Sequence, residues 1–500
     1  MSFQTRLLPS IPSSILKFSL VLLFLGVSSR MVVMGLGSYL NQSAENAALA
    51  GVLDVSENKN IFPSSDISPF RLYTYTPLHA WIVGFFIKPF QSLSLMSRVY
   101  MIRLTSLLFL SLIYLLLWKY YIKPLSISGM AFFISIGLSI SEFGNYALTA
   151  RNDFLALLIE ILAGVFFISW IRTQKKWQLI LFAISCSLSF LTRQNMFGMI
   201  LAGEIYLLTN RRFSSLLLIN FVYLLFLSTS LGLIVFYYPD FLNHSFKAHA
   251  VLWRPFYWKQ LSTLSFFTCY SLFIFLLIIQ LTKKQISPVL KFLKIALFTS
   301  ALIPVLQIYR PGGWLNYFFE TILFSLVFSS LEISHVQQLS QTSYYRKFVT
   351  YSIVTLSVIT LLISFFKAKK QFDSTAFLDY SKGAQIVKEL APQGGITLGA
   401  LAQGFGVHLR DWEIMGPELL NGAHYAESNH SHFKWVYEQL SLKVKSQSPP
   451  VLLYVHPDCG EPKIAAPLIS DRRLRKLIGN YQLKTQIYPW LCLYTLGVTG

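Results

Sequence analysis

The sequence is poor in charged residues, and acidic residues are the scarcest. Only 13% of the 500 residues are Asp, Glu, Lys or Arg, and 22 acidic residues stand against 42 Lys and Arg. Together with 54% hydrophobic residues, this lies outside the range of soluble globular proteins and within that of polytopic membrane proteins. The basic excess belongs to membrane loops, and no basic soluble surface that would bind nucleic acid is visible.

Cysteine is also rare. The four cysteines (Cys186, Cys269, Cys459, Cys492) show no metal-ligand spacing, and only the last two share a domain where they could pair. No small-residue cleavage site follows the first apolar run, so we interpret that run as a retained helix rather than a signal peptide.

Long apolar runs are what the sequence has in abundance. A membrane-spanning helix needs about 20 apolar residues. This criterion predicts eleven helices, near residues 15–38, 98–118, 127–148, 153–171, 177–193, 196–210, 213–238, 260–281, 288–309, 314–333 and 347–366. The short stretch 77–90 is bounded by prolines and is interpreted as re-entrant or interfacial.

Basic residues between the predicted helices set the orientation. Six basic loops fall on one side, which the positive-inside rule makes cytoplasmic, together with the N-terminus. One cluster, Lys367, Lys369 and Lys370, falls on the outer side against this rule. We therefore predict a transmembrane domain over 1–366 with a long first outer loop, 39–75. Residues 367–500 have strand-length apolar runs alternating with helix-like stretches, which predicts a small extracytoplasmic α/β domain.

Carboxylates of the transmembrane domain gather at the outer face. Of eleven, only Glu160, Glu204 and Glu332 lie elsewhere in the predicted topology. Because acidic residues follow no strong sidedness rule, a polar reaction site at the outer surface would explain the bias. Its cations would be Arg71, Arg98, Arg103, Arg193, Lys247, Arg254, Lys259 and Arg310.

The stretch "TARNDFLALLIE" (149–160) places Arg151, Asn152 and Asp153 directly before an apolar run. Asp153 is either a helix cap or a site acid, and capping does not exclude catalysis. We expect Asp153 to face Glu45, which lies just beyond the first helix and is otherwise a solvated loop acid. Arg151 either snorkels to the interface or positions the acid or a phosphate.

Three further stretches carry candidate residues. Arg193 in "LTRQN" interrupts two apolar runs, so it either binds an anionic lipid phosphate or pairs with a carboxylate. The loop 239–258 holds Lys247 and His244 among aromatics, where a lone histidine is more often solvated. In "YRPGGWLNYFFE" the two glycines permit a tight turn or close approach to a ligand. The candidates there are Arg310, Asn316, Tyr317 and Glu320.

Taken in order, these stretches resemble one superfamily, the GT-C fold glycosyltransferases that use polyprenyl-phosphate sugars. It includes the protein O-mannosyltransferases and the lipid A aminoarabinose transferases. "SAENAALAG" resembles the acidic motif after the first helix, with Glu45 at the acidic position but Glu-Asn for Asp-Glu. "YTYTPLHAW", with Tyr75 and His79, resembles the Tyr-x-Pro-Pro-Leu segment. "RVYMIRLTSLL", "TARNDFLAL", "LTRQN" and "PGGWLNYFFE" resemble the later motifs.

The resemblance implies inverting transfer of a sugar, hexosyl or pentosyl, from a polyprenyl-phosphate carrier at the outer face of a cell-envelope membrane. Glu45 or Asp153 would deprotonate the acceptor, which is a glycan, lipid or protein. Arg193, with Arg310 or Lys247, would stabilise the leaving phosphate. Arg151, Tyr75, His79, Asn316, Tyr317 and Glu320 would bind substrate. Whether a divalent metal assists stays open. The alternatives are a transporter or flippase of a lipid-linked or anionic substrate, and a lipid-linked glycan ligase or polymerase.

Overall fold

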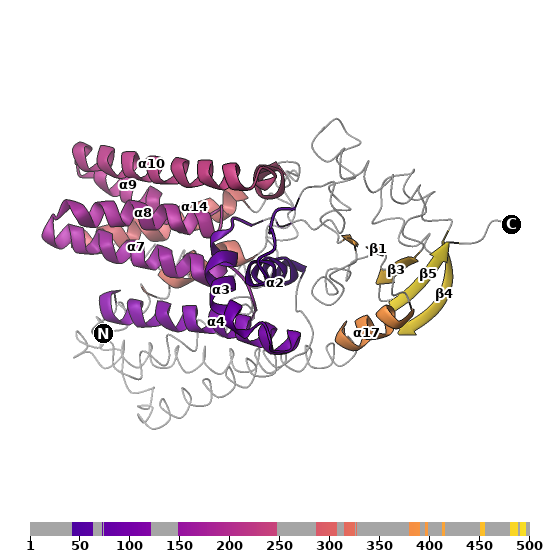
Figure 1. Ribbon diagram of the computed structural model, residues 1–500. Helices are drawn as coiled ribbons and strands as arrows, with labels where there is room; N and C mark the ends of the chain where they lie inside the picture. Colours follow the sequence, from indigo (N-terminus) through magenta and orange to yellow (C-terminus); the bar gives the residue numbers. More distant parts are fainter. Residues whose placement is uncertain are drawn as a thin grey trace, which may run out of the picture.

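The computed structural model describes residues 43–63, 73, 75–121, 149–247, 287–307, 315–325, 327 and 380–390, together with the backbone of five C-terminal strands. The predicted helices 15–38, 127–148, 260–281 and 347–366 lie outside these residues. Figure 1 shows the described helices between residues 43 and 307 gathered into one bundle, with the C-terminal helix and strands beyond one of its ends. The helices of the bundle are α2 (Ser43–Ser56), α3 (Leu78–Ile87), α4 (Leu95–Leu116), α7 (Asp153–Thr173), α8 (Lys176–Thr192), α9 (Gly198–Thr209), α10 (Phe213–Tyr237) and α14 (Pro288–Gln307).

Short helical turns extend this bundle. A 3-10 turn, η1 (Lys88–Phe90), follows α3, and the π-helical segment η2 (Leu117–Tyr121) continues α4. A second π-helical segment, η3 (Asn243–Lys247), comes after α10. The 3-10 turn η4 (Leu315–Phe318) leads into a helix at Phe319, in the region predicted as helix 314–333.

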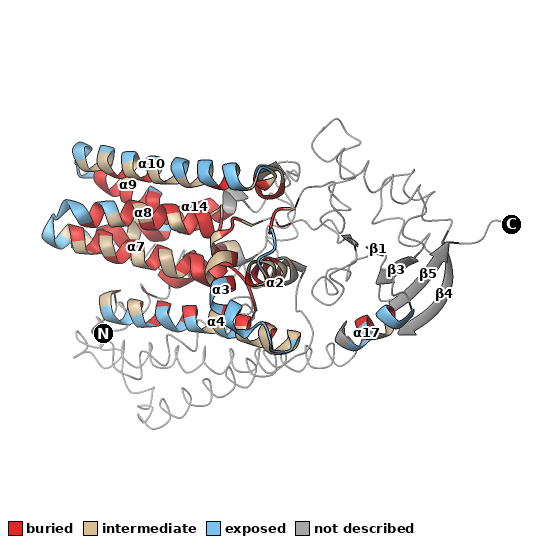
Figure 2. Ribbon diagram, in the orientation of Figure 1, coloured by how far each residue is buried: buried red, intermediate tan, exposed pale blue. Residues whose placement is uncertain are grey.

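Apolar helices of membrane-crossing length form the bundle. Among the described residues three are long and apolar enough to span a bilayer: Leu95–Tyr121, Asp153–Thr173 and Phe213–Tyr237. Helix α10 leaves Leu217, Phe221 and Phe236 more than half exposed, which suits contact with lipid. Figure 2 shows this exposed face along α10, with buried residues concentrated in α7 and α8. The protein is therefore a polytopic helical membrane protein.

Aromatic side chains hold the centre of the bundle. The Phe167 ring of α7 lies 4.8 Å from the Phe182 ring of α8 and 4.4 Å from the Phe292 ring of α14, between ring centroids. The Tyr206 ring of α9 meets Phe167 edge-on at 5.5 Å. These contacts join four helices, so the ends of α7, α8 and α9 are fixed relative to one another.

The predicted outer loop 39–75 is not all loop. Residues Ser43–Ser56 form α2, whose Ala48, Leu49, Val52 and Leu53 are fully buried. The spacing of these residues marks one helix face, but at 14 residues α2 is too short for the criterion of membrane crossing. Helix α3 is also short, at 10 residues, within the stretch interpreted as re-entrant or interfacial. A Cβ at Gly84 would lie 2.9 Å from the Val52 carbonyl oxygen, so α2 and α3 cross closely.

The C-terminal part contains one described helix and a mixed sheet. Helix α17 (Tyr380–Leu390) buries Ala384 and Val387. The strands run in the spatial order β2-β1-β3-β5-β4, and β1 pairs in parallel with both β2 and β3. Strand β5 pairs antiparallel with β3 and β4. The strands are β1 (Ile396–Leu398), β2 (Glu413–Met415), β3 (Val451–Val455), β4 (Tyr481–Tyr488) and β5 (Leu491–Leu496).

Candidate active site

The turn before α7 is held from two sides. Ser106 of α4 donates its hydroxyl hydrogen bond to the Thr149 carbonyl (2.7 Å), and Asn152 Nδ2 donates to the Thr192 carbonyl at the end of α8 (2.9 Å). Asn152 occupies the N-cap position of α7 but makes no side-chain capping hydrogen bond. Its side chain instead ties the start of α7 to the end of α8, which fixes the position of Asp153 as the first residue of α7.

Asp153 is fully buried between two guanidinium groups. Arg151 Nε lies 2.8 Å from Asp153 Oδ2, and Arg193 contacts Oδ1 at 2.6 Å. The Arg193 guanidinium also lies over the Tyr317 ring, 5.0 Å from its centroid. Arg151 is only 5% exposed, so the interpretation that it snorkels to the interface was wrong. The two guanidinium groups compensate the charge of the Asp153 carboxylate in this buried position.

Glu45 forms a second ion pair beside the same turn. Arg103 of α4 contacts Glu45 Oε1 through Nε at 2.9 Å, and the Ala150 N–H donates to the same oxygen at 2.9 Å. Glu45 is therefore not the solvated loop acid that the sequence alone would favour. The two acids lie on either side of the 149–153 turn, and the described contacts give each its own guanidinium partner.

Tyr73 and residues 75–79 lie against the C-terminal end of α8 and against η3, which follows α10. The Thr76 hydroxyl donates to the Phe190 carbonyl (3.2 Å), and the Ser245 hydroxyl of η3 donates to the Tyr75 carbonyl (2.9 Å). The Tyr73 N–H donates to His244 Nδ1, so His244 Nε2 carries the proton and faces the Pro63 carbonyl at 3.0 Å. His244 is thus buried and structural, and the expectation that it is solvated was wrong. Burial lowers the pKa of His244.

His79 lies in the first turn of α3 and is fully buried. Neither of its ring nitrogens has a hydrogen-bond partner among the described residues. Burial lowers the pKa of His79 to about 4, while the negative charge of Asp153 opposes this shift. The ring is therefore neutral at physiological pH. It offers one donor and one acceptor within electrostatic range of Asp153.

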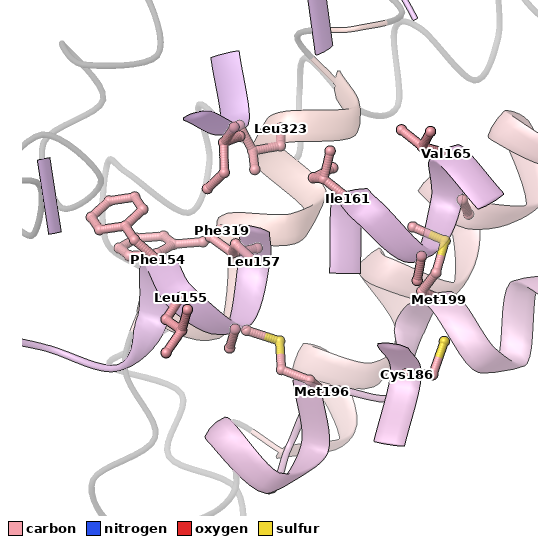
Figure 3. Close-up of a cluster of buried hydrophobic side chains, with 14 of the residues drawn as sticks. Phe154, Leu155, Leu157, Ile161, Val165, Cys186, Met196, Met199, Phe319 and Leu323 are labelled. Atoms are coloured by element: carbon pink, nitrogen blue, oxygen red, sulfur yellow. The ribbon is translucent and has the colours of Figure 1, made fainter. Parts of the chain in front are cut away.

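Two more carboxyl groups lie at the first turn of α9. Met199 donates its N–H toward Glu160 Oε1 (3.4 Å), and the Glu320 carboxyl lies so close to Gly198 that a Cβ there would clash with it. Figure 3 shows buried apolar side chains from the same segments of the chain: Leu157, Ile161, Met199, Phe319 and Leu323. The topology predicted from the sequence placed Glu160 away from the outer-face site. In the structure, Glu160 lies within electrostatic range of Arg193, a residue of that site.

The remaining candidates are placed only in part. Tyr317 contacts Arg193 as described above. Lys247 lies in η3 and Asn316 in η4, but the structure describes the side chain of neither residue. Arg310 lies outside the described residues altogether.

In the described ranges no group of three or more His, Cys, Asp or Glu side chains is arranged to hold a metal ion. Sequence reasoning missed the pairing of Arg103 with Glu45, for which no sequence signal exists.

Comparisons with known proteins bear on the fold. No protein-family model matches the chain, and no curated protein matches it. Over 95% of its length it is similar to the crystal structure of ArnT from Cupriavidus metallidurans in the apo state, with 12% identity, a TM-score of 0.60 and 97% of that chain covered. The ArnT structure bound to undecaprenyl phosphate matches at 14% identity, with a TM-score of 0.57, over 95% of this chain and 98% of that one. The chain thus shares the GT-C fold of ArnT, a lipid A aminoarabinose transferase, as the sequence resemblance predicted.

Proposed function

We propose that the protein is a glycosyltransferase that moves a sugar from a polyprenyl-phosphate carrier to an acceptor hydroxyl at the extracytoplasmic face of the membrane. One observation carries the proposal. In a chain with the fold of ArnT, Asp153 is buried at the start of α7 and held by two arginines, Arg151 and Arg193. A carboxylate beside guanidiniums supplies a general base next to a phosphate site.

In the proposed reaction Asp153 accepts the proton of the acceptor hydroxyl. The acceptor oxygen then forms a bond to the anomeric carbon from the side opposite the phosphate. The bond from that carbon to the phosphate oxygen breaks, and its electron pair leaves with the polyprenyl phosphate. Arg193 stabilises the negative charge that develops there. The anomeric configuration is inverted in this single displacement.

Arg193 has two roles in this scheme. In the structure it pairs with Asp153 at 2.6 Å and lies over the Tyr317 ring. A lipid phosphate competes for the same guanidinium, because phosphate accepts two parallel hydrogen bonds from arginine. Its binding would release one oxygen of Asp153 for the acceptor hydroxyl. Arg151 would remain on the other oxygen and hold the carboxylate in position.

Glu45 and His79 have supporting roles. Glu45 accepts hydrogen bonds from Arg103 and from the Ala150 N–H, so it orders the turn that carries Asp153 and acts as a positioning residue. His79 offers a buried, neutral ring with no partner among the described residues, which suits a hydroxyl of the sugar or acceptor. The outer face is assigned from the basic loops, which put Asp153 on the side opposite the cytoplasm.

Replacement of Asp153 by Asn tests the proposal. Purified protein is mixed with host membranes, and the release of undecaprenyl phosphate from its sugar-linked form is followed by mass spectrometry. We expect Asp153→Asn to lower release by about 100-fold or more, the usual contribution of a general base, while the variant still binds undecaprenyl phosphate.

Asp240→Asn is the matched control, since Asp240 is a partly buried acid after α10 that accepts a local hydrogen bond from Asn243. We expect release close to that of the wild type. Near-normal release by Asp153→Asn would show that Asp153 is not the base. If the unaltered protein binds the lipid but releases none, the transporter alternative is favoured.

A further inference from the structure

Glu160 and Glu320 have no part in the proposed transfer, yet both are buried at the same place. Their exposed fractions are 2% and 6%. Glu160 accepts the Met199 N–H, and the Glu320 carboxyl lies against Gly198, the preceding residue in the chain. Two carboxyl groups from separate helices therefore meet at the first turn of α9. Helix α9 extends over twelve residues, Gly198–Thr209.

Each of these carboxyl groups keeps an oxygen without a hydrogen bond. Glu160 Oε2 and Glu320 Oε1 are buried and have no partner among the described residues. Ile161 and Phe319, their neighbours in the chain, and Met199 belong to the buried hydrophobic cluster drawn in Figure 3, and such side chains cannot compensate a charge. Two neighbouring carboxylates in such surroundings cannot both be ionised at acceptable free energy, since each disfavours the charge of the other.

The balance of charge in the whole buried site supports the same conclusion. Among the described residues the buried carboxyl groups are Glu45, Asp153, Glu160 and Glu320, and the buried guanidinium groups are Arg103, Arg151 and Arg193. Full ionisation of these seven groups would leave one negative charge in excess among them. A single proton shared by Glu160 and Glu320 makes the set neutral.

The groups that act on this pair come from several helices. Arg193 at the end of α8 lies within electrostatic range of Glu160 and is the only cation among the described groups that act on the pair. Cys186 of α8, Glu204 of α9 and Tyr223 of α10 are the other titratable neighbours. The Thr299 hydroxyl of α14 donates to the Gly198 carbonyl and carries no charge. Arg193 is thus the group whose charge balance an incoming anion would change.

We propose that Glu160 and Glu320 form a proton-binding carboxyl pair behind Arg193, and that this pair takes up a proton when an anionic phosphate lipid binds at Arg193. The inference rests on the proposed function, which puts the phosphate of the carrier at Arg193. A bound phosphate takes the positive charge of Arg193 for itself. The glutamates then experience a more negative potential, and proton uptake by their carboxylate restores neutrality.

Calorimetry of lipid binding tests the pair. Undecaprenyl phosphate is titrated into the full-length protein in detergent, in buffers of equal pH and ionic strength but different ionisation enthalpy. The dependence of the observed heat on the buffer gives the number of protons taken up per lipid. Since the phosphate itself can exchange a proton, the informative quantity is the difference between the wild type and Glu160→Gln or Glu320→Gln. We expect the wild type to take up more protons, by at most about one per lipid.

Infrared spectroscopy supplies a readout that needs neither lipid nor activity. We expect a carbonyl band of a protonated carboxylic acid in the wild type near neutral pH, and its loss in Glu320→Gln. Glu57→Gln is the matched control, because Glu57 is an ion-paired and partly exposed glutamate that should leave the band unchanged.

The outcomes separate the two proposals. Equal proton numbers in wild type and variants, with normal lipid binding, would overturn the carboxyl pair and leave the proposed function intact. Absence of the protonated band would overturn it as well, even if the variants fold poorly, because this measurement uses the wild type. Failure of the wild type to bind undecaprenyl phosphate would overturn the proposed function and the coupling with it.

Discussion

At the scale of single residues, the site is built from charges that compensate one another. Asp153 has Arg151 and Arg193, and Glu45 has Arg103. Buried ion pairs add little net stability, because desolvation offsets the attraction between the charges. Their value here is position, since each ion pair holds a carboxylate in one place beside a guanidinium group.

His79 makes the stability of the folded protein depend measurably on pH. Burial lowers the pKa of His79 to about 4, whereas an unfolded chain has a histidine pKa of about 6.5. Between these values the unfolded state binds more protons than the folded state, so stability decreases as the pH falls. The full effect is about 3 kcal/mol, and it is absent above the unfolded value.

Thermal unfolding in detergent checks this dependence. Tm is measured from neutral pH down to about pH 4 for the wild type and for His79→Gln, which lacks only the imidazole at this position. We expect the wild type to lose more stability on acidification than the variant does. Parallel curves for the two proteins would contradict the assignment of a buried neutral imidazole.

At the scale of secondary-structure elements, two ion pairs join the 43–57 segment to α4, and they differ in burial. Glu45 and Arg103 are almost fully buried, with side-chain exposures of 0% and 2%. Glu57, just after α2, pairs with Arg98 at 3.0 Å, and these side chains are 20% and 12% exposed. The same two segments thus offer a buried pair and its more exposed counterpart.

We expect Glu45→Gln to destabilise the protein by about 3 kcal/mol, because it leaves Arg103 charged and buried without its partner. Glu57→Gln should cost less than about 1 kcal/mol, as for pairs near the surface. Urea unfolding of the two variants in detergent checks the difference. Simultaneous replacement of Glu45 by Gln and Arg103 by Met should recover part of the stability. Equal losses from both single variants would contradict the assignment.

At the scale of the whole molecule, orientation in the membrane decides which substrates can reach Asp153. The site lies where α7 begins and α8 ends, and the turn between α7 and α8 carries Lys175 and Lys176 at the opposite end. Lys59, after α2, has a side chain that is 59% exposed. The positive-inside rule puts Lys175 in the cytoplasm and Lys59 outside.

Cysteine labelling checks this orientation. Lys59→Cys and Lys175→Cys are made in a chain with Cys459 and Cys492 replaced by Ser, and intact cells are treated with a membrane-impermeant thiol reagent. We expect labelling of the first variant in intact cells, and of the second only after permeabilisation. The reverse pattern would place the site at the cytoplasmic face and rule out transfer at the outer face.

Much of the membrane domain was predictable because a bilayer imposes a length criterion along the chain. The predicted helices 98–118, 153–171, 177–193, 196–210, 213–238 and 288–309 correspond to α4, α7, α8, α9, α10 and α14. The length criterion did not predict helix α2, because this helix is short and only one of its faces is apolar. Helix α7 ends at Thr173, two residues beyond the predicted end, where Gln174 adopts a left-handed conformation before the basic turn.

By itself the sequence determined which segments enter the membrane and which residues, above all Asp153 and Arg193, are too costly to be there without a purpose. Only the tertiary structure decided their partners. It paired Glu45 with Arg103, 58 residues away, placed His244 beneath Tyr73, and brought Glu160 to Glu320 at the start of α9. The physical reason is that a buried charge must be compensated by whatever group helix packing brings next to it, and that packing joins residues far apart in the chain.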